Sequence, residues 1–209
     1  MQPVFNHSDV TDFLRACKPK RMTSHLHAIP PFCKNESHNL SHYHKLDTSL
    51  HGCEILIRAI RPSDKLALKN GFKRLSPRSV YCRFLGYRKE LTEAELKDLT
   101  EVDFIHHVAL VAEFHPANKP VGVGRFVVLP DAGLITAEAA ITIDEEFHGL
   151  GIATLLLNHL LQIGKFLNIQ QVVAEVLSSN REMLNIIHRM NLNTQKEISG
   201  DCVKITLHL

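Results

Sequence analysis

Residues 138–154 bring a carboxylate and a glycine turn together in one short segment. Glu138 interrupts a run of small and apolar residues that predicts a strand, and the turn that follows contains Gly149 and Gly151. A helical pattern begins at Ile152, so the helix starts with free backbone N–H groups and the positive end of its dipole, which bind phosphate. A carboxylate on the strand before the turn is placed to act as a base. The segment therefore predicts group transfer from a nucleotide-type cofactor.

Both parts of this segment also have a plain structural interpretation. A turn with Gly149 and Gly151 is often only a tight connection, and a dinucleotide fingerprint would need a third glycine where Thr154 stands. Glu138 alone would be interpreted as a strand residue that faces solvent. The context along the chain has to decide between these interpretations.

The composition of the chain limits the classes of protein to consider. Its 209 residues are 44% hydrophobic, carry a net charge of +2 and include five cysteines without paired spacing. No segment reaches the ~20 apolar residues of a membrane span, and the N-terminus lacks the basic and apolar regions of a secretory signal. Unpaired cysteines fit a reducing compartment, and scattered basic residues give no reason to expect nucleic acid. We expect a soluble cytoplasmic protein with no membrane or nucleic-acid partner.

The first part of the chain differs in composition from the rest. Residues 1–52 are rich in histidine and hold short apolar clusters, and a short helix is expected over 9–17. We interpret 1–52 as an N-terminal extension of unknown role and 53–209 as one compact domain. Some histidines and cysteines of the extension invite a zinc hypothesis, but they lack a zinc-site framework, so no metal is expected: they are His38, His42, His44, Cys17 and Cys33.

Strand and helix patterns alternate after residue 53. Alternating or continuous apolar runs predict strands over 53–60, 107–114, 121–129, 137–143, 171–177 and 203–209. Caps and apolar periodicity predict helices over 65–75, 76–84, 92–99, 152–167 and 180–190. Asn168 and Asn191 stand where helices end and a left-handed residue is wanted. The fold class is therefore α/β (α+β), with one mixed sheet.

Two motifs carry a resemblance to a known family. The first is His148-Gly-Leu-Gly-Ile-Ala153 with the Thr-Leu-Leu-Leu that follows, and the second is Asn180-Arg-Glu-Met-Leu after a predicted strand. Over 53–209 the chain resembles the GNAT superfamily of N-acetyltransferases. It is most similar to the catalytic domain of bacterial Pat-type protein lysine acetyltransferases, in segments 57–64, 74–84, 99–104 and 107–112.

The resemblance implies a mostly antiparallel central sheet flanked by helices, with acetyl-CoA at a splay between two central strands. The backbone N–H groups at the glycine turn would hold the pyrophosphate, and a β-edge would pair with the pantetheine arm. Asn180 would hydrogen-bond the cofactor, although a helix N-cap is its default role. The residues expected at the pyrophosphate are Gly149, Leu150, Gly151, Ile152, Ala153 and Thr154, and those expected at the pantetheine are Ile141, Thr142 and Ile143.

The resemblance also assigns the general base. Glu138 matches the position that supplies the base in protein-acetylating members, and a lysine amine with a pKa of ~10.4 needs one near neutral pH. Glu113 and Glu175, on neighbouring strands, are the alternative bases. His148 replaces the usual Gln or Arg, and it would donate to phosphate or face solvent. Ile187 occupies the place of the family's tyrosine acid, so a thiolate would leave unaided or through water.

The expected function is therefore transfer of acetyl from acetyl-CoA to a primary amine. The leading acceptor is a protein lysine, by direct attack in a ternary complex, because no cysteine lies on the strand or turn of the site. Three alternatives stay open: a small amine, an N-terminal amino group, and a catalytically silent acyl-CoA sensor. A homodimer is possible.

Overall fold

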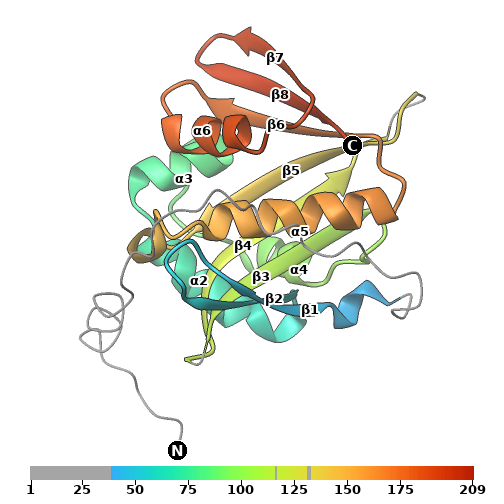
Figure 1. Ribbon diagram of the computed structural model, residues 1–209. Coiled ribbons are helices and arrows are strands. Elements are labelled where there is room, and N and C mark those ends of the chain that lie inside the picture. Colours follow the sequence, from blue (N-terminus) through green and yellow to red (C-terminus); the bar gives the residue numbers. More distant parts are fainter. Residues whose placement is uncertain (1–38, 116, 131–132) are drawn as a thin grey trace, which may run out of the picture.

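Eight strands form a single sheet in the order β1-β2-β3-β4-β5-β6-β8-β7 (Figure 1). The structure, a computed structural model, describes residues 39–115, 117–130 and 133–209. All neighbouring strands pair antiparallel except β5 and β6, which are parallel. The strands are β1 (His44–Thr48), β2 (Glu54–Ala59), β3 (His107–Phe114), β4 (Lys119–Val128), β5 (Thr136–Ile143), β6 (Gln171–Leu177), β7 (Thr194–Ser199) and β8 (Cys202–His208).

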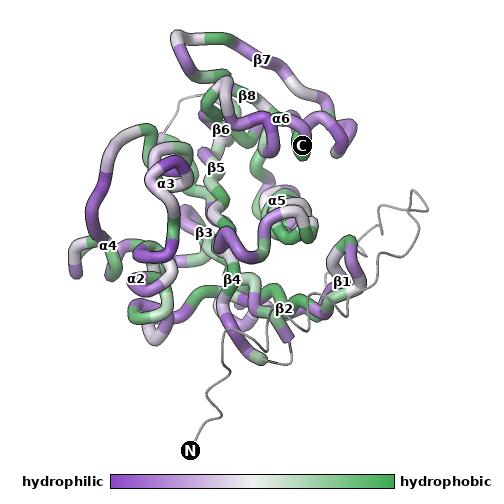
Figure 2. The backbone as a smooth tube through the Cα atoms, turned by 90° about the vertical axis from the view of Figure 1, so that its left-hand side faces the viewer, coloured by the Kyte–Doolittle hydropathy of each residue, from purple (hydrophilic) through white to green (hydrophobic). Residues whose placement is uncertain are grey.

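Helices cover both faces of the sheet. Helices α5 and α6 lie on one face, and α2, α3 and α4 lie on the other (Figure 2). The helices are α2 (Lys65–Arg74), α3 (Pro77–Phe84), α4 (Glu93–Thr100), α5 (Ile152–Phe166) and α6 (Arg181–Arg189). Short 3₁₀ turns are η1 (Leu40–His42), η2 (Pro62–Asp64) and η3 (Glu145–Phe147). The expected mostly antiparallel sheet flanked by helices is confirmed.

Helix α5 packs closely on the middle of the sheet because β4 carries glycines beneath it. A Cβ on Gly122 would lie 2.6 Å from Ile143 Cδ1, and one on Gly124 would lie 3.0 Å from Leu160 Cδ1. Leu156 and Leu160 are fully or almost fully buried. The apolar face of α5 therefore packs on a stretch of β4 where Gly122 and Gly124 carry no side chains, and this close packing brings the start of the helix next to the end of β5.

The sheet begins before residue 53, the expected start of the compact domain. Strand β1 pairs with β2 from His44 opposite Arg58 to Thr48 opposite Glu54, and Leu40 and Tyr43 are buried in the main core. Residues 40–52 thus belong to the same core. Side chains of β1 alternate between exposed and half-buried, so the strand has too little apolar character to stand out in the sequence.

A buried polar chain fixes this N-terminal part to α5. The Tyr43 hydroxyl hydrogen-bonds His159 Nδ1, and His159 Nε2 lies 3.3 Å from Asp47 Oδ2. His159 is fully buried, so its ring nitrogens need these partners.

The remaining elements follow the expected order. The capping box at Thr92 and Glu95 is present, and Asn168 and Asn191 adopt left-handed φ angles of 58° and 50°. Strand β7 was not expected, because five of its six residues are exposed and polar character dominates. The short helix expected over 9–17 lies outside the described residues. None of the helices in the described ranges has the length and apolar character to span a bilayer.

Candidate functional site

The parallel strands β5 and β6 separate directly after Glu138. Their paired positions are Thr136 with Gln171, Ala137 with Val172, and Glu138 with Val173. Beyond this point β5 continues to Ile143, and β4 is the only strand of the described residues that pairs with it there. The structure therefore contains a splay between two central strands, and Glu138 stands where it begins.

The backbone alternation of β5 determines which groups face the splay. Asp144 N–H donates to the carbonyl of Val121 at 2.8 Å, and the Thr136 carbonyl accepts from Leu129 N–H at 2.8 Å. Even-numbered residues of β5 thus bond to β4, since antiparallel partners alternate. The backbone groups of Ile141 and Ile143 consequently turn to the splay, whereas Thr142 turns its backbone to β4.

The glycine turn leaves a series of donors unused. Gly149 and Gly151 have φ angles of 77° and 82°, which non-glycine residues rarely adopt. Leu155 N–H makes the first bond of α5, to the Gly151 carbonyl at 3.1 Å. The N–H groups from Gly149 to Thr154 have no acceptor among the described residues. Such a row of N–H groups at a helix start fits a phosphate.

His148 lies between the turn and the splay. It is exposed, and its Nε2 donates to the Ile143 carbonyl at 3.1 Å. The side chain therefore holds one of the β5 backbone groups that faces the splay. The family resemblance implied either a phosphate contact or exposure to solvent for His148. The structure shows in addition a hydrogen bond from the ring to the backbone of β5.

The β1–β2 turn contacts the glycine turn, which the sequence did not indicate. Leu50 N–H donates to the Leu150 carbonyl at 3.1 Å. A Cβ on Gly151 would lie 2.6 Å from Leu50 Cγ. The conformation of the turn therefore depends on a residue from the N-terminal side of the expected domain boundary.

Asn180 is the N-cap of α6, the helix that follows β6 along the chain. Its side-chain oxygen accepts from Met183 N–H at 3.2 Å, so the N-cap role is present. Ile187, in the place of the family's tyrosine, is buried with 3% exposure and belongs to the main core. No acid can act from that position.

Glu138 is exposed on the face of the sheet that α3 covers. Its carboxylate makes no hydrogen bond or ion pair with any of the described residues. Burial lowers the pKa of Arg83 on α3, and the charge of Glu138 partly offsets this effect, which places the two side chains near each other.

The alternative bases have different surroundings. Glu113 is held by Arg58, whose Nε donates to Oε1 at 2.8 Å in a largely buried cluster with Asp64. Its carboxylate is therefore already engaged within the protein and is not free to contact an acceptor. Glu175 is exposed, two residues beyond the last position where β6 pairs with β5.

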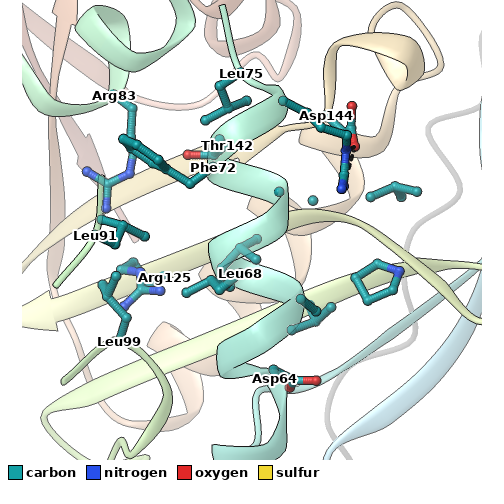
Figure 3. Close-up of a pocket in the computed structure, with 18 of the residues that line it drawn as sticks. Asp64, Leu68, Phe72, Leu75, Arg83, Leu91, Leu99, Arg125, Thr142 and Asp144 are labelled. Atoms are coloured by element: carbon teal, nitrogen blue, oxygen red, sulfur yellow. Dashed lines mark hydrogen bonds and ion pairs between the residues drawn. The ribbon is translucent and has the colours of Figure 1, made fainter. Parts of the chain in front are cut away.

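A cavity opens between the sheet and helices α2, α3 and α4 (Figure 3). It has a volume of about 100 Å³. The Arg83 and Arg125 guanidinium groups lie on the same side of it. At its rim Arg74 Nε donates to Asp144 Oδ2 at 2.8 Å. Much of its wall is apolar and includes Leu68, Phe72, Leu75, Leu91, Leu99 and Val111.

Arg125 is the site residue that sequence reasoning missed. Its position, an arginine within the apolar run of β4, was the available signal. Arg125 is 7% exposed, and its Nη1 donates to His107 Nε2 at 3.2 Å. Burial and the nearby charge of Arg83 lower its pKa to about 9.

The described residues contain no group of three or more His, Cys, Asp and Glu side chains that could hold a metal ion. The candidate site consists of the backbone donors at the glycine turn, the β5 edge, Glu138, and the cavity that contains Arg83 and Arg125.

Comparisons with known proteins identify this arrangement. A family model described as the acetyltransferase (GNAT) family matches residues 79–191. An acetyltransferase of Pseudomonas aeruginosa is 29% identical over 148 residues, which cover 70% of this chain and 78% of that protein. The acetyltransferase Pat of Mycolicibacterium smegmatis is 30% identical over 144 residues, covering 69% of this chain and 43% of Pat. The chain thus matches less than half of the length of that Pat.

Solved structures show the same fold. The GNAT domain of S. lividans PAT superposes with a TM-score of 0.73 at 22% identity, covering 79% of this chain and 97% of that one. The structure of yncA from Salmonella typhimurium with its cofactor acetyl-CoA has a TM-score of 0.59 at 16% identity, covering 74% and 92%. The matched family model spans more than half of the 209 residues. The chain therefore belongs to the acetyltransferase (GNAT) family, close to the catalytic domains of Pat-type enzymes.

Proposed function

We propose that this acetyltransferase moves acetyl from acetyl-CoA to a primary amine of a protein lysine, with Glu138 as the general base. Family membership and the relatives named acetyltransferase support the reaction class. The similarity to Pat supports a protein lysine as the acceptor.

The unused N–H groups from Gly149 to Thr154 would hold the pyrophosphate of acetyl-CoA. The positive end of the α5 dipole favours the same negative group. The backbone groups of Ile141 and Ile143 would pair with the amides of the pantetheine arm, as an added strand does. His148 would then exchange its bond to Ile143 for a phosphate oxygen, and Asn180 would approach the arm from α6.

This placement would bring the thioester to the beginning of the splay, next to Glu138. Glu138 takes a proton from the lysine ammonium, directly or through one water. The neutral amine attacks the thioester carbonyl and the C–N bond forms. The nitrogen then gives its second proton to water as the C–S bond breaks. Coenzyme A leaves as a thiolate, which water protonates, because Ile187 offers no acid. Glu138 returns its proton to solvent.

The position of Glu138 is the observation that carries this proposal. Its carboxylate has no ion-pair or hydrogen-bond partner among the described residues, and it stands at the last residue before the strands diverge. The test is release of free thiol from acetyl-CoA with a panel of proteins, lysine peptides, polyamines and amino acids. Transfer to protein lysine supports the proposal. Transfer only to small amines changes the acceptor, and acetyl-CoA binding without transfer to any amine indicates a sensor.

A further inference from the structure

Two guanidinium groups, those of Arg83 and Arg125, share the cavity under helices α2, α3 and α4, and the charge of Glu138 acts only on Arg83, from beyond ion-pair distance. Among the described residues, neither Arg83 nor Arg125 has a carboxylate within ion-pair distance. Arg125 is 7% exposed, its described hydrogen-bond partner is the ring of His107, and the charge nearest to it in effect is the like charge of Arg83. Buried cations in proteins are nearly always paired with an anion, because removing them from water is costly.

The two carboxylates that line the cavity are already engaged. Asp64 binds Arg58 through both carboxylate oxygens at 2.8 Å, and Asp144 binds Arg74. The guanidinium of Arg83 stacks over the ring of Phe84, with 4.9 Å from Cζ to the ring centroid. An aromatic face offsets part of a positive charge but leaves the N–H donors of the group available.

We propose that this cavity is an acceptor subsite that binds a carboxylate, and that the preferred acceptor carries a carboxylate near its amine. The two guanidinium groups supply the charge and the planar donors that recognise a carboxylate. The apolar wall fits the carbon chain that connects the carboxylate to the rest of the acceptor. The role of the bound molecule as acetyl acceptor rests on the proposed function. Binding of a carboxylate in the cavity does not depend on it.

The cavity and Glu138 share one face of the sheet. Arg125 pairs with Ala140, and Val127, two residues further along β4, pairs with Glu138. Side chains two residues apart point to the same face. A carboxylate held by Arg125 would therefore leave an amine on the same molecule close to Glu138. In a protein, an acidic residue near the lysine would supply this group; in a small molecule, it would be the carboxylate of an amino acid.

The first experiment measures binding without catalysis. Titration of the protein with 4-methylpentanoate, followed by NMR, should show binding, and 4-methylpentanamide, which has the same shape and no charge, should bind about tenfold or more weakly. Arg125→Met and Arg83→Met should remove this preference. Arg189→Met, which removes an exposed guanidinium on α6, should keep it. Thermal unfolding of each variant shows whether it is folded.

Equal binding of the acid and its amide, or an unchanged preference in both cavity variants, overturns the proposal.

The second experiment separates the sources of the carboxylate. Lysine peptides with Glu or Gln beside the lysine, and free amino acids with their amides, are compared as acceptors. If the acidic member of a pair has a lower KM than its amide, and Arg125→Met removes this difference, the subsite binds that class of acceptor. If no pair shows a difference, the proposal is overturned. Binding of the acid without transfer to any amine leaves the cavity as a carboxylate site and rejects the proposed function alone.

Discussion

Glu138 and Val173 form the last paired position of the parallel strands β5 and β6. Sheet geometry therefore fixes the backbone of the proposed base, while its carboxylate lies in an opening between strands. A base held in this way loses little conformational entropy when the acceptor arrives.

Replacement of Glu138 by Gln should remove turnover and keep cofactor binding. The amide has the same size but cannot take up a proton, so kcat should fall by roughly 10²- to 10⁴-fold. Acetyl-CoA affinity by calorimetry should stay within about twofold, because the proposed cofactor contacts come from backbone groups. The matched control is Glu175→Gln on β6, which should retain activity. Full turnover in the Glu138 variant would assign the base to another residue.

Replacement of Gly151 by Glu should abolish acetyl-CoA binding. The φ of 82° is unfavourable for a side chain, the new Cβ would clash with Leu50, and the added negative charge would repel phosphate. Gly149→Ala is the matched control, because its φ is also positive but no atom lies within 4 Å of the added Cβ. We expect calorimetry to show weakened binding for the control and none for Gly151→Glu. Equal affinities of both variants and the wild type would argue against a cofactor site at this turn.

His107 should make the free energy of unfolding depend on pH. Burial and the charge of Arg125 lower its folded-state pKa below the ordinary value, although Asp103 and Asp98 act in the opposite direction. The unfolded chain therefore binds the proton more readily. This contribution to stability is complete above the unfolded pKa of about 6.5 and declines as the pH falls below it. Urea unfolding between pH 7 and pH 5 should show a smaller decline for His107→Gln, whose amide oxygen can still accept from Arg125. An identical decline in both proteins would show that His107 does not contribute to the pH dependence of the free energy of unfolding.

Arg125→Met should stabilise the protein in the absence of ligand. The wild-type side chain keeps a guanidinium buried without an anion, whereas a methionine of similar length fills the same volume without a charge. We expect the free energy of unfolding to rise by roughly 1 kcal/mol. Chemical denaturation measures the change, and Arg189→Met should show none. A clear loss of stability would mean that the bond to His107 outweighs the cost of burial.

Asp64→Asn should be strongly destabilising. Although burial lowers the pKa of Arg58, its bonds to Asp64 and Glu113 raise it overall, so the cation is firmly held. Loss of one charged partner in this buried cluster should cost about 3–5 kcal/mol. Glu93→Gln breaks the exposed ion pair with Lys69 and should leave the unfolding midpoint unchanged. Similar changes in the free energy of unfolding for the two substitutions would contradict the prediction that the buried cluster contributes more to stability than the exposed ion pair.

Much of the fold could be predicted because local signals agreed with the final packing. The apolar stripe of α5, the capping box at Thr92 and the left-handed Asn168 each act within a few residues. Strands β1 and β7 escaped prediction because they lie at the two edges of the sheet. Their side chains meet solvent, so backbone pairing rather than an apolar face defines them.

The candidate site also contains residues that the sequence could predict and residues that it could not. Glu138 and the glycine turn lie in one continuous segment, so their order along the chain already indicated a shared role. The contact of Leu50 with Gly151 and the approach of Arg83 to Arg125 join residues that are distant in sequence. Only the three-dimensional arrangement of the hairpin and of α3 brings these side chains together.

The bond from Leu50 N–H to the Leu150 carbonyl connects the β1–β2 hairpin directly to the glycine turn, so we expect the order of one segment to affect the other. Thermodynamic linkage then works in both directions. A phosphate that orders the turn also slows hydrogen exchange in the hairpin, and loosening of the hairpin increases the entropy that a phosphate must remove when it binds. If the glycine turn holds the cofactor as proposed, the affinity of the site would depend partly on the N-terminal edge of the sheet.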